Sequence, residues 1–399
     1  MKPKVLFVQH ANVMGGSVQS LAHQLGGLSN LQPQYEIELA ISTADSSIRD
    51  LYQHSVSRTH DLKLAFFHNT TAHKPRSWNV TNHLFSCVKI LWSCFMLLRF
   101  LRKHNFDIVY FNSYVLAPYL LVCKFLGVRA ILHVRESPVP TLFNLRNKIG
   151  NLLIRKYSLS TIFLSEFERD RWGFPKNSSV VHNFISMPDG PRCGLIKDDP
   201  FIILYMGGYS RIKGIKEFLT PFSRFIHSNR HSGRDIKLVF LGGAISSKVN
   251  WYRELLIRIA GLVGVRPYSA QVNRLISDMN ISYAIDREKT VKSVIPFVKK
   301  ASVVVFPATK HHFPRPVVEA SAFSVPVVVS NLEGYAELVK HGETGFLSEI
   351  CDFDKYLQIL FDDPVSAHKI GIANYNFAKK RFDLETNVRR IHELICEVL

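Results

Sequence analysis

Two basic residues near the middle of the sequence, Arg211 and Lys213, stand in a setting that suits phosphate chemistry. They follow a run that predicts a strand, Phe201–Met206, and a glycine pair that includes Gly208. A helix is predicted to begin two residues after Lys213. Glycines leave backbone N–H groups open, a guanidinium can bind two oxygen atoms, and an ammonium adds a mobile charge. The segment therefore predicts a diphosphate site; the alternative is a solvated basic turn.

A second group of polar residues follows the apolar run Ser302–Phe306, which predicts another strand. A short helix is predicted over Val317–Phe323, and Pro316 suits its first position. Glu319 falls one turn into that helix, where its carboxylate can accept hydrogen bonds from the two hydroxyls of a ribose. Arg315 adds a cation that attracts a phosphate or an acidic sugar. The alternative for Glu319 is local capping or pairing.

A third feature is the glycine pair Gly15 and Gly16, between the predicted strand Val5–Gln9 and the helical run Val18–Leu28. Glycines between a strand and a helix let backbone N–H groups approach an anion at the start of the helix. The pair is not a dinucleotide-binding fingerprint, because it lacks the G-x-G-x-x-G spacing and the acidic residue about 20 positions later. An ordinary turn is the alternative.

Short apolar runs that alternate with helical stretches position these residues. The alternation predicts parallel sheets with crossover helices, and ligands are expected at the carboxyl ends of the strands. Length favours two domains, because 399 residues exceed a comfortable single core. Strands are predicted at Val5–Gln9, Glu36–Ile41, Ile108–Asn112, Ala130–Val134, Thr161–Leu164, Val180–Val181, Phe201–Met206, Lys237–Leu241, Ser302–Phe306 and Pro326–Ser330.

Between the halves, Ser186–Pro200 is polar and rich in Pro and Gly, which predicts a linker over residues 187–199. The domains are then expected over residues 1–186 and 200–383, as two doubly wound α/β domains that face a central cleft. Residues 384–399 predict an amphipathic helix, which is expected to pack back on the first domain. The basic stretch Ser246–Arg274 predicts further helical material in the second domain.

The net charge of +18 favours an anionic partner: nucleic acid, an anionic membrane surface or a phosphorylated substrate. The apolar stretch Leu84–Leu101 is interrupted by Lys89 and Arg99, and it is too short for a bilayer span. Two interpretations stay open for it: a helix packed on a sheet, or a helix that also touches an anionic membrane surface. The six cysteines show no spacing typical of zinc, and the N-terminus has no signal-peptide pattern, so a cytoplasmic protein is expected.

The sequence resembles glycosyltransferase family 4 over most of its length. The run Phe313–Leu347 (FPRPVVEASAFSVPVVVSNLEGYAELVKHGETGFL) has that family's nucleotide-sugar-binding signposts in order. The turn Gly207–Gly214 is similar to its phosphate-contacting turn, and Gly15 and Gly16 to its N-terminal glycine loop. The resemblance implies the GT-B fold, with an N-terminal acceptor-side domain and a C-terminal nucleotide-sugar-binding domain. It also implies transfer that needs no metal and retains the anomeric configuration, so no metal site and no cofactor are expected.

By this resemblance Lys213 binds the donor diphosphate and Glu319 the ribose, while Gly15 and Gly16 lie near the phosphates or the acceptor. Gly208 stands where the family often has an arginine, and Arg211 is expected to supply that charge. His311 stands where the first of two glutamates is usual, so backbone amides around Phe313, Pro314 and Arg315 are expected to help hold the sugar.

The family's N-terminal histidine corresponds to either His133 or Arg135. A histidine can hydrogen-bond the sugar or the leaving group, whereas an arginine can only stabilise charge. The alternative for His133 is a core histidine whose hydrogen bonds are satisfied.

These features predict a hexosyltransferase that moves a sugar from a nucleoside-diphosphate donor to a glycan or lipid-linked glycan acceptor. Cell-surface polysaccharide or lipopolysaccharide synthesis is the expected setting, at the inner face of the membrane. The alternatives are a non-catalytic GT-B protein that serves as a binding partner or scaffold, and a nucleotide-sugar epimerase. Nucleic-acid binding is not expected, because no basic and aromatic interleaving accompanies the charge.

Overall fold

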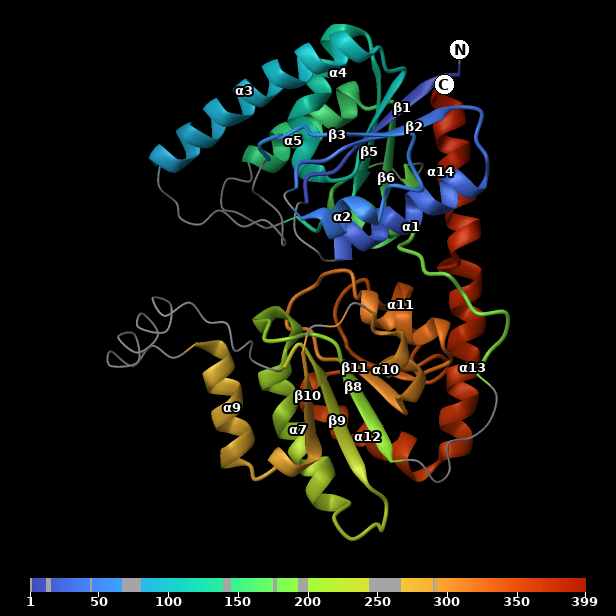
Figure 1. The fold of residues 1–399 in the computed structure, drawn as a ribbon. Helices are drawn as coiled ribbons and strands as arrows, with labels where there is room; N and C mark the ends of the chain where they lie inside the picture. Colours follow the sequence, from blue (N-terminus) through green and yellow to red (C-terminus); the bar gives the residue numbers. More distant parts are fainter. Residues whose placement is uncertain are drawn as a thin grey trace. The chain divides into compact units, whose positions relative to one another are not determined.

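The computed structural model describes residues 2–11, 16–43, 45–66, 80–138, 145–174, 178–192, 200–243, 267–289, 291 and 293–399, with the backbone alone for 80–84, 145 and 146. Contacts divide the chain into two compact units, Met1–Ser186 with Arg381–Leu399, and Met187–Lys380. In the described parts of each unit, helices lie on both faces of one parallel sheet (Figure 1). The chain therefore has a two-domain α/β fold.

In the first unit, the described strands form a parallel sheet in the order β3-β2-β1-β4-β5-β6-β7. Val5 of β1 is in register with Ile37 on one side and Ile108 on the other. The strand order reverses between β1 and β4, so a ligand is expected at the carboxyl ends of these two strands. The strands are β1 (Lys4–Val8), β2 (Glu36–Ala40), β3 (Arg58–His60), β4 (Ile108–Phe111), β5 (Arg129–Val134), β6 (Ser160–Phe163) and β7 (Ser179–Val180).

Helices cover both faces of this sheet because its strands are apolar on both sides. On β1, Leu6 and Val8 pack with one cluster of helices and Val5 and Phe7 with the other. The first face carries α3 (Val80–His104), α4 (Leu120–Leu126) and α5 (Leu145–Tyr157), and the second carries α1 (Gly16–Asn30) and α14 (Leu384–Val398) (Figure 1). Shorter elements are α2 (Ser46–Asp50), η1 (Tyr114–Tyr119) and α6 (Glu166–Arg171).

In the second unit, the described strands run β10-β9-β8-β11-β12-β13, again all parallel, with the reversal between β8 and β11. The strands are β8 (Phe201–Tyr205), β9 (Ile236–Leu241), β10 (Ile285–Glu288), β11 (Val303–Phe306), β12 (Val327–Ser330) and β13 (Phe346–Ser348). The helices are α7 (Ile215–Ser228), α9 (Tyr268–Asp278), α10 (Ile295–Lys300), α11 (Arg315–Ala322), α12 (Phe353–Asp362) and α13 (Pro364–Arg381), with the 3₁₀ turns η2 (Arg211–Lys213), η3 (Ser282–Ala284), η4 (Tyr335–Glu337) and η5 (Ile350–Asp352).

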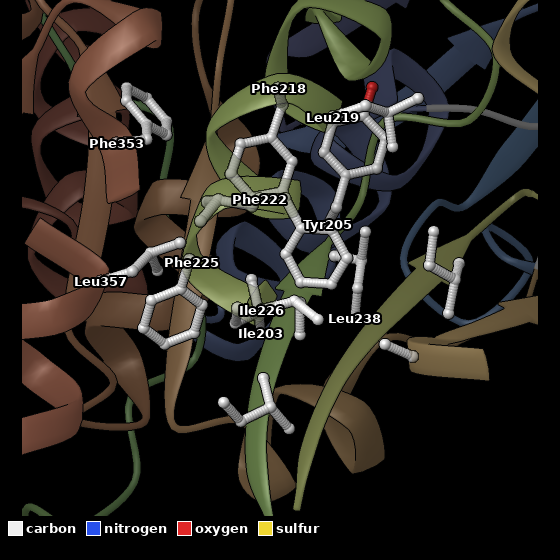
Figure 2. Packing of buried hydrophobic residues seen from close by; sticks show 14 of the residues in the cluster. Ile203, Tyr205, Phe218, Leu219, Phe222, Phe225, Ile226, Leu238, Phe353 and Leu357 are labelled. Atoms are coloured by element: carbon white, nitrogen blue, oxygen red, sulfur yellow. The ribbon is translucent and has the colours of Figure 1, made fainter. Parts of the chain in front are cut away.

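The core beside this sheet depends on aromatic residues at helical spacing. Phe218, Phe222 and Phe225 lie on one side of α7 and pack on β8 and β9 (Figure 2). Phe353 and Leu357 of α12 belong to the same cluster, and the ring of Phe353 lies 5.9 Å from that of Phe218 (Figure 2). This packing fixes α7 on the sheet, and with it the turn that precedes α7.

Ten strands were predicted from the sequence, and each lies within one residue of its predicted ends. Three strands were missed: β3, β10 and β13. All three are edge strands, and residues of β3 and β10 such as Arg58, Asp286 and Glu288 are exposed. Because an edge strand needs no apolar run on both faces, the apolar pattern that identifies central strands is absent there.

Some predicted boundaries differ from the structure. Pro316 occupies the second helical position, not the first, because α11 begins at Arg315. Residues 187–192 belong to the second unit, where the Tyr375 hydroxyl donates to the Pro188 carbonyl (2.6 Å). Residues 381–383 belong to the first, where the Ile185 N–H donates to the Phe382 carbonyl (3.0 Å). Residues 193–199 of the predicted linker and 246–266 of the predicted helical stretch lie outside the described residues.

The C-terminal helix α14 lies in the first unit beside α1, where Val388 fills the space next to Gly27. In the part of the chain that the structure describes, every helix is too short or too polar to cross a bilayer.

Candidate functional site

The second unit brings two of the predicted segments together at the point where its strand order reverses. Strands β8 and β11 are neighbours, with Ile203 in register with Val303. The turn that holds Lys213 leaves the carboxyl end of β8, and the loop that leads to Glu319 leaves the carboxyl end of β11. This edge of a doubly wound sheet is where such folds bind ligands.

The turn after β8 requires glycine at two positions. Gly208 and Gly214 have φ of 54° and 68°, in the left-handed region. A Cβ on Gly214 would lie 1.7 Å from the carbonyl oxygen of Pro307, so only glycine fits. The Tyr205 hydroxyl lies 3.3 Å from the carbonyl oxygens of Gly208 and Lys213. The two glycines and the Tyr205 hydroxyl therefore fix the backbone conformation of this turn.

Hydrogen bonds also join the two loops. The N–H of Thr309 donates to the carbonyl of Ile212 (3.0 Å), and its hydroxyl donates to the carbonyl of Arg211 (3.0 Å). The two segments of the candidate site therefore form one connected surface.

Lys213 and Glu319 come close enough for their charges to interact. The positive charge of Lys213 favours the ionised form of Glu319, as does Arg315, whose guanidinium lies 3.2 Å from the carboxylate. Burial is nevertheless the dominant effect: it raises the pKa of Glu319 and lowers the pKa of Lys213. The result is a largely buried carboxylate under the influence of two cations, a polar site that can bind hydroxyl donors beside an anion.

His312 is a member of this site that the sequence did not single out. Its Nδ1 lies 2.8 Å from the carbonyl oxygen of Lys310, so Nδ1 carries the proton and Nε2 is an acceptor. Among the described residues, Nε2 is buried and has no hydrogen-bond partner. Burial, together with a smaller effect of the positive charge of Lys213, lowers the pKa of His312 to about 4. A neutral acceptor therefore stands beside the cation at neutral pH.

Tyr335 fixes the backbone around His312. Its hydroxyl donates to the His312 carbonyl (2.8 Å) and lies 3.4 Å from the His312 N–H. The ring of His311 lies 5.3 Å from the ring of Tyr335, a contact the sequence could not reveal.

The other predicted donor residues lie as follows. The guanidinium of Arg211 is exposed and stands over the ring of Tyr268, at 5.3 Å from its centre, rather than beside Glu319. Phe313 accepts a hydrogen bond at its carbonyl from the Arg315 N–H (3.2 Å). Pro314 is buried and directly precedes α11. The structure thus groups Lys213 with the α11 residues and leaves Arg211 at the rim.

In the first unit, Arg135 is the centre of a polar network at the carboxyl end of β5. Its guanidinium donates to Gln24 (2.6 Å) from α1 and to Asn112 (2.6 Å) from the end of β4. It also donates to Ser20 (2.9 Å) and Asn183 (3.1 Å). These four partners were not predicted, because segments far apart in the sequence supply them.

His133 and the glycine pair have different placements. His133 is completely buried within β5, its Nδ1 lies 2.7 Å from the hydroxyl of Tyr110, and burial lowers its pKa well below the usual value. Its Nε2 is also buried and, among the described residues, has no hydrogen-bond partner, so the burial of the ring suits a core histidine while the unpartnered nitrogen suits one that meets a ligand. Gly16 begins α1, and Gly15 lies outside the described residues.

Residues 191–377 match the family model described as glycosyl transferases group 1. The chain is 28% identical over 156 residues to the capsular polysaccharide biosynthesis glycosyltransferase CapM of Staphylococcus aureus, covering 39% of this chain and 34% of that protein. It is 29% identical over 139 residues to the UDP-Gal:alpha-D-GlcNAc-diphosphoundecaprenol alpha-1,3-galactosyltransferase of Escherichia coli, covering 31% of this chain and 35% of that one. The alignments thus span about a third of the length of these relatives.

The crystal structure of Anabaena Alr3699/HepE in complex with UDP and glucose is similar in fold, with a TM-score of 0.74 and 16% sequence identity. The similarity covers 99% of this chain and 100% of that one. The GT-B fold expected from the sequence is confirmed, whereas membership of family 4 in particular stays a prediction. Residues 191–377, a little under half of the chain, are therefore similar to the glycosyl transferases group 1 family.

Proposed function

We propose that this chain is a retaining glycosyltransferase that moves a sugar from a nucleoside-diphosphate donor to a glycan or lipid-linked glycan acceptor. The observation that carries the proposal is the convergence of Lys213 and Glu319 where the strand order of the second unit reverses. A cation beside a carboxylate, at the loops where such sheets bind nucleotides, suits a diphosphate next to a ribose.

In this proposal, Lys213 binds the donor diphosphate and stabilises it as it leaves. Glu319 accepts hydrogen bonds from the ribose hydroxyls, and Arg315 keeps it ionised. His312, close enough to Lys213 for that charge to lower its pKa, offers a further acceptor nitrogen, which suits a sugar hydroxyl. The bond from the anomeric carbon to the diphosphate breaks, a bond to the acceptor oxygen forms on the same face of the sugar, and the proton of the acceptor hydroxyl passes to the leaving diphosphate. Selective stabilisation of the leaving charge supplies much of the rate enhancement.

The names of the similar proteins support this choice of donor and acceptor. The E. coli relative is named for UDP-Gal and a diphosphoundecaprenol acceptor, and the S. aureus relative for capsular polysaccharide. We therefore place the reaction in cell-surface polysaccharide synthesis, and a uridine nucleotide is the first donor to test. A lipid-linked acceptor would place the protein at the cytoplasmic face of a membrane, which agrees with its net charge of +18.

The first test is the thermal shift of the full chain with UDP, GDP and dTDP, followed by transfer assays with the matching sugar donors. Lys213→Ala and Glu319→Ala are each expected to weaken nucleotide binding by about tenfold or more. The matched controls are Lys355→Ala and Glu343→Ala, which remove exposed charges of the same unit. Both controls should bind the nucleotide as the wild type does.

Three outcomes would change the proposal. If no nucleotide stabilises the protein, the site assignment fails. If a nucleotide binds but no sugar is transferred to any acceptor, the non-catalytic alternative gains support. That alternative is suggested by His311, which stands where a glutamate is usual. If nucleotide is released from the donor without an acceptor, an epimerase is favoured.

A further inference from the structure

We infer that the outer face of α3, α4 and α5 docks on the surface of an anionic bilayer. This membrane face is defined by six exposed apolar side chains, Phe85, Leu91, Trp92, Phe95, Phe125 and Leu152. The inference goes beyond sugar transfer, since it concerns a surface of the first unit and needs no donor.

Helix α3 is apolar on two sides, although only one of them packs on the rest of the unit. Its inner side is occupied by Ser93, Leu97 and Leu101, which are spaced four residues apart and buried, and the two leucines belong to the core cluster of that face of the sheet. On its outer side, Leu91 and Trp92 keep 69% and 63% of their surface exposed. A helix that only packs on a sheet carries polar residues there. The outer side of α3 is therefore apolar for a reason other than folding.

The apolar surface continues onto the neighbouring helices. All three helices cover the same face of the sheet, and α4 contacts both α3 and α5 (Figure 1). Phe125 of α4 is 70% exposed and Leu152 of α5 is 61% exposed. Exposed apolar residues shared by three adjacent helices form an extended surface, of the kind that marks an interaction site.

The cations of this region stand beside the exposed rings. The ammonium of Lys89 lies 4.3 Å from the ring centre of Phe85, and the guanidinium of Arg102 lies 5.9 Å from that of Phe125. Residues 62–165 contain fourteen Lys or Arg residues and two acidic ones, Asp107 and Glu136. Most of the net positive charge of the chain therefore belongs to the segment that includes the membrane face.

This combination fits a bilayer surface better than other partners. Two copies of the face would repel each other, because the described parts of α3, α4 and α5 contain no acidic residue to pair with their cations. A nucleic acid would use the cations and stack on the rings, but it offers nothing to Leu91 or Leu152. In a bilayer surface, apolar side chains enter the acyl boundary while Lys and Arg meet anionic headgroups.

The test is co-sedimentation of the full chain with sucrose-loaded vesicles of phosphatidylcholine, with and without phosphatidylglycerol. The wild type should bind the anionic vesicles, and more weakly at high salt. The apolar variant L91S/W92S should bind about tenfold or more weakly at every salt concentration. The charge variant K89Q/R99Q should bind about 25-fold more weakly at low salt, given about fivefold per cation, and almost as the wild type does at high salt.

Each variant has a matched control. Y283S/I359S removes two exposed apolar side chains of the second unit, and R389Q/R390Q removes two exposed cations from α14. Both controls should bind vesicles as the wild type does. All variants should keep the wild-type thermal midpoint and its shift with UDP, so that a loss of lipid binding is separate from a loss of fold or of donor binding.

The inference is overturned if the wild type leaves anionic vesicles unbound, or if the controls lose as much binding as the face variants. It is also overturned if sedimentation velocity shows a dimer that L91S/W92S converts to a monomer without any lipid binding, since a second copy would then cover the face. RNA binding that K89Q/R99Q abolishes while vesicle binding persists in L91S/W92S would likewise overturn it.

Discussion

The N–H of Thr309 donates a 3.0 Å hydrogen bond to the carbonyl oxygen of Ile212, and this contact joins the loops that follow β11 and β8. The contact depends on the close approach of Gly214 to Pro307. The candidate donor site is therefore built on a backbone arrangement, and the side chains of Lys213 and Glu319 are placed by it.

We expect Gly214→Ala to destabilise the second unit by about 3 kcal/mol or more. The new Cβ would lie 1.7 Å from a carbonyl oxygen, and φ of 68° is strained for alanine. Gly233→Ala is the matched control, because Gly233 has φ of 74° but open space around its Cβ. It should cost only about 1 kcal/mol. Urea unfolding measures the free energy of unfolding of both variants. Equal losses of stability would show that the backbone at Pro307 moves away and accommodates the new Cβ.

The turn between β8 and α7 shows which features of the site could be predicted from the sequence. The strand before it, the glycines and the basic residues were all visible, because central parallel strands are continuous apolar runs and glycine marks unusual backbone. The contact with Pro307 was not visible, because it depends on how two segments about 90 residues apart meet. Lys213 and Glu319 were predicted first from their placement after strands and then from a resemblance, and the structure shows why these two loops meet at the edge of the sheet.

His312 and Arg135 mark the limit of prediction from sequence. The sequence pointed to His311 because it replaces a glutamate of the family pattern, whereas the buried acceptor nitrogen belongs to His312. For Arg135 the sequence left two candidates open. The structure adds the burial of His133 and the network around Arg135, which follow from packing of β4, β5 and α1, and the choice between the two residues stays a prediction. Side-chain burial is a property of the assembled core, so spacing along the chain does not report it.

We expect the affinity for UDP to fall at acid pH through Glu319. The carboxylate accepts hydroxyl hydrogen bonds only when ionised, and burial raises its pKa above the usual 4.5. The contribution is therefore present at neutral pH and lost as the pH falls through that raised pKa. Glu319→Gln should bind about tenfold or more weakly at neutral pH, a difference that shrinks in acid. Calorimetric titration compares the two proteins at each pH, which cancels the titration of UDP itself.

A constant ratio between the wild type and Glu319→Gln at every pH would contradict this role. It would mean that the carboxylate contributes shape or packing, because its charge state would then not matter to the ligand.

We expect His312 to make the fold acid-sensitive. Its pKa of about 4 lies below the ordinary 6.5, so between these values the unfolded chain takes up the proton and the folded chain does not. Stability from this group is complete above pH 6.5 and falls as the pH decreases, by about 2 kcal/mol at pH 5. His312→Asn should lose less stability between pH 7 and 5 than the wild type. His231→Asn, on an exposed turn, should follow the wild type in the same urea titrations.

We expect sugar transfer to proceed without a divalent metal, because in the proposed mechanism Lys213 supplies charge to the leaving diphosphate. The transfer rate should stay within about twofold when EDTA is added, since no step depends on a bound ion. The measurement is product formation with EDTA, Mg²⁺ or Mn²⁺. Activity that disappears with EDTA and returns with Mn²⁺ would give the diphosphate a metal partner and reduce the role assigned to Lys213.

Two variants test whether Arg135 or His133 acts on the substrate. If His133 is a core residue, Tyr110→Phe should lower stability by about 1–2 kcal/mol, because it leaves the buried Nδ1 without the Tyr110 hydroxyl, yet change turnover by less than about twofold. Arg135→Lys keeps the positive charge but loses the guanidinium nitrogens that donate to Gln24 and Asn112. If Arg135 contacts the substrate, this variant should lower turnover by about tenfold or more. Both are measured well below the unfolding midpoint, so that the folded fraction is equal. A large loss of turnover in Tyr110→Phe, with little in Arg135→Lys, would reverse the assignment and make His133 the residue that acts on the sugar.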